Sequence, residues 1–496
     1  MGIIKKLVSQ TAIYGLSSIF GRFLNYLLVP LYTYYFSAAE YGVVSEFYAY
    51  AGFFSVLLLL GFETGYFRFR DKANTRQDVA YSTALLFVLL LNLGFLGLIV
   101  LFNQQLSSVL NYSQHPEYVL CFSSILILDA SAALPFARLR AENKAIKFAS
   151  IKLIEILLTV FLSLFFIVYC PKALSQNPNS WVIWVYKPEL GVAYIFLANL
   201  IASAFKFIVL MPQFFGLRWG FNKALFHKMY RYSLPMVVIG FAGIINEMLD
   251  RALLKYLLPY DAQTNMQMLG IYSACYKLSI LMSLFIQAFR FAAEPFFFAY
   301  ADKNDAKEVY ARVLKYFVIF CVFIFLLVSL FLDFFKYFLG EEFRAGLNIV
   351  PILLMANLFL GIYVNLSIWY KLTDKTLLGS IVALLGAVIT VGLNLWWIPL
   401  LGYAGSAWAT LVCYCFMVLV SYSLGRHYYP VAYDLKRILG YILLGTALFY
   451  FRGLLPFSTG WQNSWLLSTA LLALYVLFVF LFEKDLPKQS IQSRVI

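Results

Sequence analysis

Residues 68–102 read RFRDKANTRQDVAYSTALLFVLLLNLGFLGLIVLF, a basic stretch followed by a long apolar run. The apolar part has the length that an α-helix needs to cross the hydrocarbon core of a bilayer, about 20 residues. The basic part carries Arg68, Arg70, Lys72 and Arg76, and loops that collect Lys and Arg stay on the cytoplasmic side. This one stretch therefore predicts both a membrane-spanning helix and the side from which the helix enters.

The same alternation of basic and apolar stretches runs through the whole chain of 496 residues, which is 62% hydrophobic. Its 38 Lys and Arg residues fall almost entirely in every second gap between apolar runs. We therefore predict an all-α integral membrane protein with about 14 transmembrane helices. The runs cover roughly residues 11–36, 41–66, 79–102, 117–137, 148–169, 191–211, 233–257, 267–289, 314–332, 347–369, 377–398, 402–424, 438–455 and 464–482.

The distribution of positive charge between the two sets of gaps predicts the topology. The richer set includes both termini and the even-numbered gaps, and it includes Lys206, which this interpretation assigns to the loop after the sixth run. Both termini of a multi-pass protein of the cytoplasmic (inner) membrane are therefore expected in the cytoplasm. The other set of gaps holds only Lys172, Lys187, Lys336, Arg344 and Arg452.

The formal charge of +14 is spread over these predicted cytoplasmic loops, so it indicates topology and attraction to anionic membrane lipids, and we expect no nucleic-acid partner. The first run is too long for a signal peptide and lacks a cleavage site, which predicts a retained first span. The six cysteines have no zinc-type spacing, and we expect no metal site and no cofactor. The three histidines, His115, His227 and His427, have no acid-base constellation around them, so we expect no catalytic residues.

Two short similarities within the chain indicate how the spans are grouped. The second run begins with Gly42 and has Ser and Tyr at the same spacing as the eighth run has after Gly270. The sixth run opens at Leu190 and the twelfth at Leu401 with Leu-Gly-x-Ala. Pairing spans 2 with 8 and 6 with 12 predicts a parallel repeat, a known transporter design. The expected parts are an N-terminal lobe of spans 1 to 6 (residues 1–228), a C-terminal lobe of spans 7 to 12 (229–425), and two additional spans with a cytoplasmic tail (426–496).

The opening of the chain resembles a known family. The carrying motifs are Val29-Pro30-Leu31-Tyr32-Thr33, the Glu40-Tyr41-Gly42 turn and the Leu401-Gly402-Tyr403-Ala404-Gly405-Ser406-Ala407 entry to the twelfth span. With them the chain is similar to the polysaccharide-repeat-unit flippases of the multidrug/oligosaccharidyl-lipid/polysaccharide exporter superfamily. That resemblance implies two lobes around a central cavity that opens alternately to either side. It also implies an oligosaccharide on a polyprenyl diphosphate carrier as cargo.

Charged residues inside the spans are the first candidates for a cargo site, because a charge near the middle of the bilayer costs a few kcal/mol. Arg22 lies about halfway along the first run and has no acidic residue within a helical turn. We predict that it holds the diphosphate, since the guanidinium presents a fork of donors that matches phosphate oxygens. The alternative is a structural pair with an acid on another span, such as Asp250. Lys277, in span 8, is predicted to bind cargo on the same argument.

Two other cations are candidates for cargo binding but have local acids. Arg251 follows Glu247 by four residues in span 7, a spacing that permits a self-contained ion pair. Arg290 precedes Glu294 by four residues at the predicted cytoplasmic end of span 8, where we favour an interfacial pair or gate.

Three carboxylates are candidates for coupling transport to a proton or sodium ion: Asp129 in span 4, Glu155 in span 5 and Asp250 in span 7. A buried carboxylate binds a proton more readily than one in water, which is why such residues mark ion pathways. The alternative is pairing, and Lys152 lies three residues before Glu155.

Three amides, Asn25, Asn246 and Gln287, are candidates for bonds to sugar hydroxyls. The alternative is that they join helices, which is the commoner role of such residues in membrane bundles.

The favoured function is a flippase of lipid-linked oligosaccharide repeat units for surface polysaccharide, such as O-antigen or capsule. A polysaccharide polymerase and glycosyltransferases are expected functional partners. The alternatives are a cation-coupled drug exporter of the same superfamily, which would favour acidic over basic cavity residues, and a membrane-embedded glycosyltransferase or polymerase, which would present catalytic residues in a sizeable loop. The sugar, the coupling ion and the oligomeric state are not encoded in any of these patterns.

Overall fold

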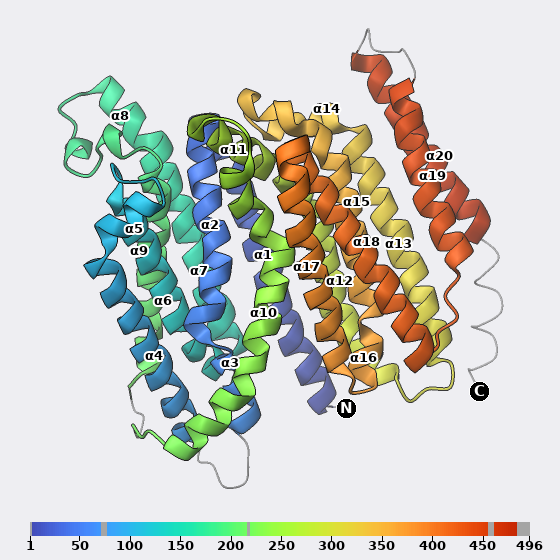
Figure 1. Cartoon of the computed structure of the whole chain (residues 1–496), viewed down its shortest axis with the longest axis horizontal. Helices are drawn as coiled ribbons and strands as arrows, with labels where there is room; N and C mark the ends of the chain where they lie inside the picture. Colours follow the sequence, from blue (N-terminus) through green and yellow to red (C-terminus); the bar gives the residue numbers. More distant parts are fainter. Residues whose placement is uncertain (1, 71–76, 216–218, 455–460, 484–496) are drawn as a thin grey trace. The chain divides into compact units, whose positions relative to one another are not determined.

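The computed structural model describes residues 2–70, 77–215, 219–454 and 461–483, and this part of the chain is nearly all helix (Figure 1). Thirteen of its helices are long and apolar enough to cross a membrane. The first predicted span corresponds to a further helix, α1 (Gly2–Tyr35). The prediction of an all-α protein with about 14 transmembrane helices is confirmed. Several predicted cytoplasmic cations lie outside the described side chains: Lys5, Lys6, Lys72, Arg76, Arg218, Lys484, Lys488 and Arg494.

The chain forms two compact units. The first contains residues 1–273 together with 390–403. Its helices are α1, α2 (Ala38–Leu59), α3 (Phe62–Phe69), α4 (Gln77–Leu101), α5 (Asn103–Val109), α6 (Pro116–Ala141), α7 (Ala145–Leu164), α8 (Cys170–Gln176), α9 (Ala193–Leu210), α10 (Lys223–Leu257) and most of α11 (Ala262–Leu278). A short π-helical segment, Phe165–Tyr169, joins α7 to α8.

The second unit contains residues 274–389 and 404–496. Its helices are α12 (Ile280–Tyr300), α13 (Ala306–Leu330), α14 (Leu332–Phe335), α15 (Val350–Leu366), α16 (Ile368–Leu372), most of α17 (Thr376–Leu401), α18 (Tyr403–Tyr428), α19 (Leu435–Leu454) and α20 (Trp461–Glu483). Within this unit α13 packs against α12, α15, α19 and α20. The predicted lobes 1–228, 229–425 and 426–496 concern the repeat and stay a prediction; the compact units divide the chain elsewhere.

Local sequence explains where α2 begins and ends. Ser37 caps its first turn, because the Ser37 hydroxyl accepts from the Glu40 backbone N–H while the Glu40 carboxylate accepts from the Ser37 N–H. At the other end Leu60 and Gly61 have positive φ angles of 43° and 70°. These left-handed residues end α2 and redirect the chain into α3, a conformation for which glycine carries no steric penalty.

The eighth predicted span, 267–289, is wrong in its boundaries, because the structure breaks it at Ser279 into α11 and α12. The Ser279 hydroxyl donates to the Tyr276 carbonyl at 2.7 Å and accepts from Asn357 Nδ2 at 3.2 Å. A serine hydroxyl bonded to a nearby carbonyl competes with the helical hydrogen-bond ladder, which explains the break. Lys277 therefore lies in the last turn of α11, and the span that follows is Ile280–Tyr300.

The long helix α10 runs alongside α2 and α3 in the first unit (Figure 1). Gly52 of α2 brings the helices close, since a Cβ at this position would lie 2.9 Å from Met248 Sδ. At Gly240 of α10 a Cβ would lie 3.2 Å from Val56 Cγ1. Small residues at such crossings are how membrane helices pack without a hydrophobic driving force between them. The result is a continuous α2–α10 contact along most of α2.

Candidate functional site

The face of α1 that carries the first candidate residue points away from the packed interior of the first unit. Arg22 and Asn25 lie one turn apart and are both exposed, whereas Tyr32 is buried and its hydroxyl is 3.0 Å from Ser163 Oγ on α7. Arg22 makes no ion pair with any residue in the described ranges. A guanidinium near mid-span that lacks an internal partner is available to an anionic ligand.

Asp250, the suggested structural partner of Arg22, has other contacts. Tyr272 donates to Asp250 Oδ2 at 2.6 Å, and Arg251 Nη1 lies 3.4 Å from Asp250 Oδ1. Arg251 also donates to the main-chain carbonyl of Glu247 at 2.8 Å. The side-chain pair with Glu247 that the four-residue spacing permits is not formed. The Arg251 guanidinium lies against the buried Asp250 carboxylate instead, and Glu247 is exposed.

Asn246 is buried one turn before Asp250, and its Oδ1 accepts a 3.0 Å hydrogen bond from Thr390 Oγ1. This bond joins α10 to the part of α17 that belongs to the first unit. It is the helix-joining arrangement that amides commonly adopt in membrane bundles. Contact between Asn246 and a sugar stays a prediction, as it does for exposed Asn25.

The coupling candidates Asp129 and Glu155 share one buried ammonium. Lys206 Nζ lies 2.7 Å from Asp129 Oδ1 and 2.5 Å from Glu155 Oε1, and the Lys206 side chain is only 3% exposed. Ser203 donates to the same Asp129 oxygen at 2.7 Å, and Lys152 lies 3.6 Å from Glu155 Oε2. The assignment of Lys206 to a cytoplasmic loop is wrong, because two in-span carboxylates require a counter-ion and Lys206 supplies it from α9. Ion coupling through this triad stays a prediction.

In the second unit, Gln287 on α12 is partly buried and Arg290, almost one turn later, is exposed. The predicted pair between Arg290 and Glu294 is wrong, because Glu294 forms its ion pair with Lys371 of α16. Arg290 makes no ion pair with any residue of the described ranges. Lys277 is partly buried at the end of α11. The use of Lys277, Arg251 and Arg290 for cargo stays a prediction.

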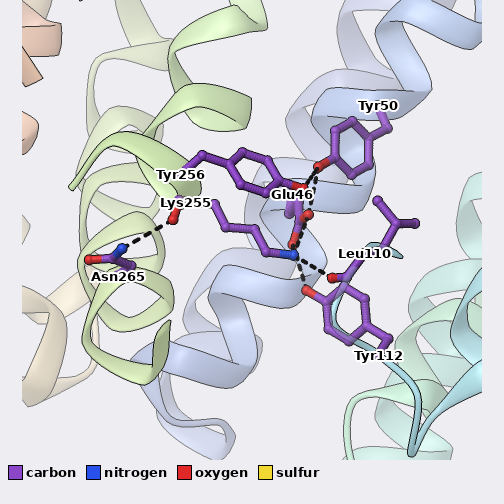
Figure 2. Close-up of polar contacts among 7 residues, drawn as sticks. All are labelled: Glu46, Tyr50, Leu110, Tyr112, Lys255, Tyr256 and Asn265. Atoms are coloured by element: carbon purple, nitrogen blue, oxygen red, sulfur yellow. Dashed lines mark hydrogen bonds and ion pairs between the residues drawn. The ribbon is translucent and has the colours of Figure 1, made fainter. Parts of the chain in front are cut away.

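A buried ion pair between two residues that were not predicted from the sequence joins α2 to α10 in the first unit (Figure 2). Lys255 Nζ lies 2.8 and 3.0 Å from the two carboxylate oxygens of Glu46 and donates to the Leu110 carbonyl at 2.7 Å. Glu46 also accepts from the hydroxyls of Tyr50 at 2.7 Å and Tyr112 at 2.5 Å. The carboxylate thus has four donor contacts, and the ammonium uses all three of its N–H groups.

This cluster is dry and built from several segments. The side chains of Glu46 and Lys255 are 0% and 8% exposed. Asn265 of α11 donates to the main-chain carbonyl of Lys255 at 3.1 Å, on the side away from Glu46 (Figure 2). Burial, and then the negative charge of Glu46, raise the pKa of Tyr112, so this hydroxyl stays a donor. Full satisfaction of both charges is what makes such a buried pair tolerable, because an unpaired buried charge costs several kcal/mol.

Signals for the missed residues were present in the sequence. Glu46 is an acid inside the second apolar run, and Lys255 is a base inside the seventh. An intramembrane charge of one sign predicts a partner of the other sign, but a sequence alone does not show which spans are neighbours. Within the described residues, no group of three or more His, Cys, Asp and Glu side chains could hold a metal ion.

The sequence of this chain matches that of a known protein family. The profile of the family described as "Polysaccharide biosynthesis protein" matches residues 7–301. No match was found among curated protein sequences.

Solved structures of transporters are similar over most of the chain. "Lipid II flippase MurJ, inward closed conformation" gives a TM-score of 0.74 at 16% identity, over 96% of this chain and 99% of that chain. "Inward-facing conformation of a multidrug resistance MATE family transporter of the MOP superfamily" gives 0.61 at 13% identity, over 82% and 93%. The structure described as the outward-facing conformation of a transporter of that same family gives 0.59 at 14% identity, over 85% and 95%.

These neighbours are flippases and transporters rather than enzymes, and the predicted family is confirmed. The protein is a multi-pass membrane member of the polysaccharide biosynthesis protein family, with the fold shared by the MurJ flippase and the MATE transporters.

Proposed function

We propose that this protein flips polyprenyl-diphosphate-linked oligosaccharide repeat units across the cytoplasmic membrane by alternating access, for the synthesis of a surface polysaccharide such as O-antigen, capsule or lipopolysaccharide. Membership of the polysaccharide biosynthesis family supports a glycan cargo. The fold shared with a lipid II flippase and with drug transporters supports translocation as the activity. Glycosyltransferases would act before this step, and a polymerase would act after it.

The proposal rests on the exposure of Arg22 and on its lack of an ion pair with any described residue. An exposed guanidinium on an apolar helix, without an ion pair to any described residue, is costly unless it serves a ligand. A diphosphate is a suitable ligand, because its oxygens accept the paired N–H donors of arginine. Asn25 on the same face of α1 would reach sugar hydroxyls beside the diphosphate.

Drug export remains the rival within the same fold, and the two functions differ in the charge of the cargo. A cationic drug would be repelled by Arg22, which lacks an ion pair to any described residue. Coupling to a proton or sodium ion through Asp129, Glu155 or Asp250 is compatible with either cargo. Anionic cargo is therefore the better match to the exposed cations.

The test is replacement of Arg22 in a host whose surface glycan depends on this protein. Arg22→Ala should lower surface glycan at least tenfold with unchanged abundance of the protein in the membrane, because the diphosphate loses its counter-charge. Arg22→Lys should retain much of the display, since it keeps the charge and loses only the bidentate geometry. Lys172→Ala is the matched control: it removes one exposed positive charge from α8 and should have no effect.

Normal glycan display with Arg22→Ala would overturn the assignment of this residue. Loss of drug tolerance with intact glycan, measured in the same strains, would favour the exporter instead.

A further inference from the structure

Two contacts lie close together near the start of α2. One is a crossing of α2 and α11 at Gly42 and Gly270, and the other is the ion pair between Glu46 and Lys255. The predicted topology places the start of α2 and the end of α10 on the outer side, because each lies where an outward span ends or an inward span begins. Both contacts therefore belong to the predicted outer end of the first unit.

The glycine crossing is reciprocal. A Cβ on Gly42 would overlap the backbone oxygen of Met266, and a Cβ on Gly270 would overlap the backbone oxygen of Ala38. In each helix the oxygen belongs to the residue four positions before the glycine. The two helices therefore contact each other through equivalent backbone positions. Such self-complementary contacts arise around two-fold axes. Gly42 and Gly270 are also the residues that correspond in the predicted repeat, so the crossing lies where an axis between the repeats would pass.

The contacts that Glu46 and Lys255 make beside this crossing are polar. When Glu46 and Lys255 are together, protein groups satisfy every charge, through the Leu110 carbonyl and the hydroxyls of Tyr50 and Tyr112 (Figure 2). If the helices part on the outer side, water can satisfy the same groups. An apolar contact would instead expose hydrophobic surface on opening, at about 25 cal/mol per Å². Touching glycine backbones and a buried ion pair are thus suited to repeated opening.

The rest of the α2–α10 contact differs in chemistry. Toward the predicted inner end it is made by apolar side chains against glycines, as at Gly52 with Met248 and Gly240 with Val56. This part exposes hydrophobic surface if it separates, so it favours remaining closed.

We propose that the Glu46–Lys255 pair, with the Gly42–Gly270 crossing, is the outer latch of the transport path. It releases when the protein opens outward, and the glycine-lined part of α2 and α10 acts as the pivot. This proposal rests on the alternating access of the proposed function.

Cross-linking at two heights of the same helix pair tests the latch. Glu46→Cys with Lys255→Cys, on a background without native cysteines, would be joined by a reducible bis-methanethiosulfonate cross-linker. Val56→Cys with Gly240→Cys is the matched control, since a Cβ at Gly240 lies 4.0 Å from Val56 Cβ, within the range for a disulfide. The outer cross-link should lower surface glycan at least tenfold, with recovery after reduction, whereas the control should change it less than twofold. Normal display with the outer cross-link, or equal loss at both heights, would overturn the latch.

A distance measurement distinguishes failure of the latch from failure of the proposed function. It also tests the latch if the protein with the two cysteines does not fold. Spin labels at Val109→Cys and Tyr260→Cys, both exposed, report on the separation of the α5 end from the α10 end. In vesicles, Glu46→Gln should enrich a longer distance population relative to the parent, and the charge exchange Glu46→Lys with Lys255→Glu should restore the parental distribution. Identical distributions in all three proteins would overturn the latch whatever the cargo. A longer population together with normal glycan in Arg22→Ala would retain the latch and reject the cargo assignment.

Discussion

The first unit holds two charge clusters that differ in their exposure. In the latch one ammonium faces one carboxylate, and the Glu46 and Lys255 side chains are 0% and 8% exposed. In the triad one ammonium, Lys206, is shared by Asp129 and Glu155, and the Asp129 side chain is 47% exposed. The latch is therefore dry, whereas the triad is partly open, and Lys152 brings a second ammonium to within 3.6 Å of Glu155 Oε2.

This difference in exposure indicates that the two clusters have different functions. A neutral, fully satisfied pair holds its helices together while water is absent, because separation in a dry environment leaves two unsolvated charges. A carboxylate that shares its counter-ion and is half exposed can take up a proton or a cation without dismantling the cluster. We therefore expect changes at the latch to act mainly on stability and conformation, and changes at the triad to act on coupling.

The largest effect on stability is expected for Lys255→Met, which leaves the Glu46 carboxylate charged and buried. Loss of one partner of a buried pair typically costs about 3–5 kcal/mol. Thermal unfolding in detergent should show a large fall in Tm. The double variant Glu46→Gln with Lys255→Met should recover most of the loss, because no buried charge remains. Equal Tm values for the single variant and the parent would show that the pair is not buried in the membrane-embedded protein.

A smaller loss is expected for Lys206→Met. Lys152 then remains 3.6 Å from Glu155 Oε2, and the exposure of Asp129 allows water to reach its carboxylate, so we expect about 2 kcal/mol, less than for a fully buried pair. Unfolding curves of the parent and of Lys206→Met would check this; a fall in Tm as large as that of Lys255→Met would contradict it.

The coupling hypothesis predicts that Asp129→Asn lowers transport about tenfold, equivalent to roughly 1.4 kcal/mol in the rate-limiting barrier. Its transport should also respond less to an imposed proton or sodium gradient than the parent does. Surface glycan measured with and without an ionophore provides the comparison. Ser203→Ala is the control, since it removes a hydroxyl donor to the same Asp129 oxygen and leaves every charge in place. A variant that keeps the parental response to both gradients would exclude Asp129 as the coupling residue.

The sequence predicted the fold well because apolar length and loop charge report directly on the membrane. It predicted the partners of charges poorly, because partners depend on which helices are neighbours. Lys206 counted as a loop residue from its position near the end of an apolar run, yet it lies between two carboxylates on other helices. Four-residue spacing suggested pairs of Arg251 with Glu247 and of Arg290 with Glu294. Arg251 instead contacts its sequence neighbour Asp250, and Glu294 pairs with Lys371 of α16. At the break, the Ser279 hydroxyl also accepts a hydrogen bond from Asn357, which is far away in sequence.

The smallest effect is expected at a third cluster, which lies at the end of α6 and in the short loop that follows it. Glu142, between α6 and α7, contacts Arg138 and Lys144 at 2.7 Å each, and its side chain is 26% exposed. Burial alone would raise the pKa of Glu142, but these cations outweigh burial and the pKa is lowered from its ordinary value of 4.5.

A lowered folded-state pKa means that the stabilisation is complete above the ordinary value and is lost as pH falls through the folded value. Glu142→Gln should therefore cost less than about 1 kcal/mol at neutral pH, as exposed pairs do. The difference in Tm from the parent should vanish in acid; a difference that widens as pH falls would show that Glu142 is not held ionised by its neighbours.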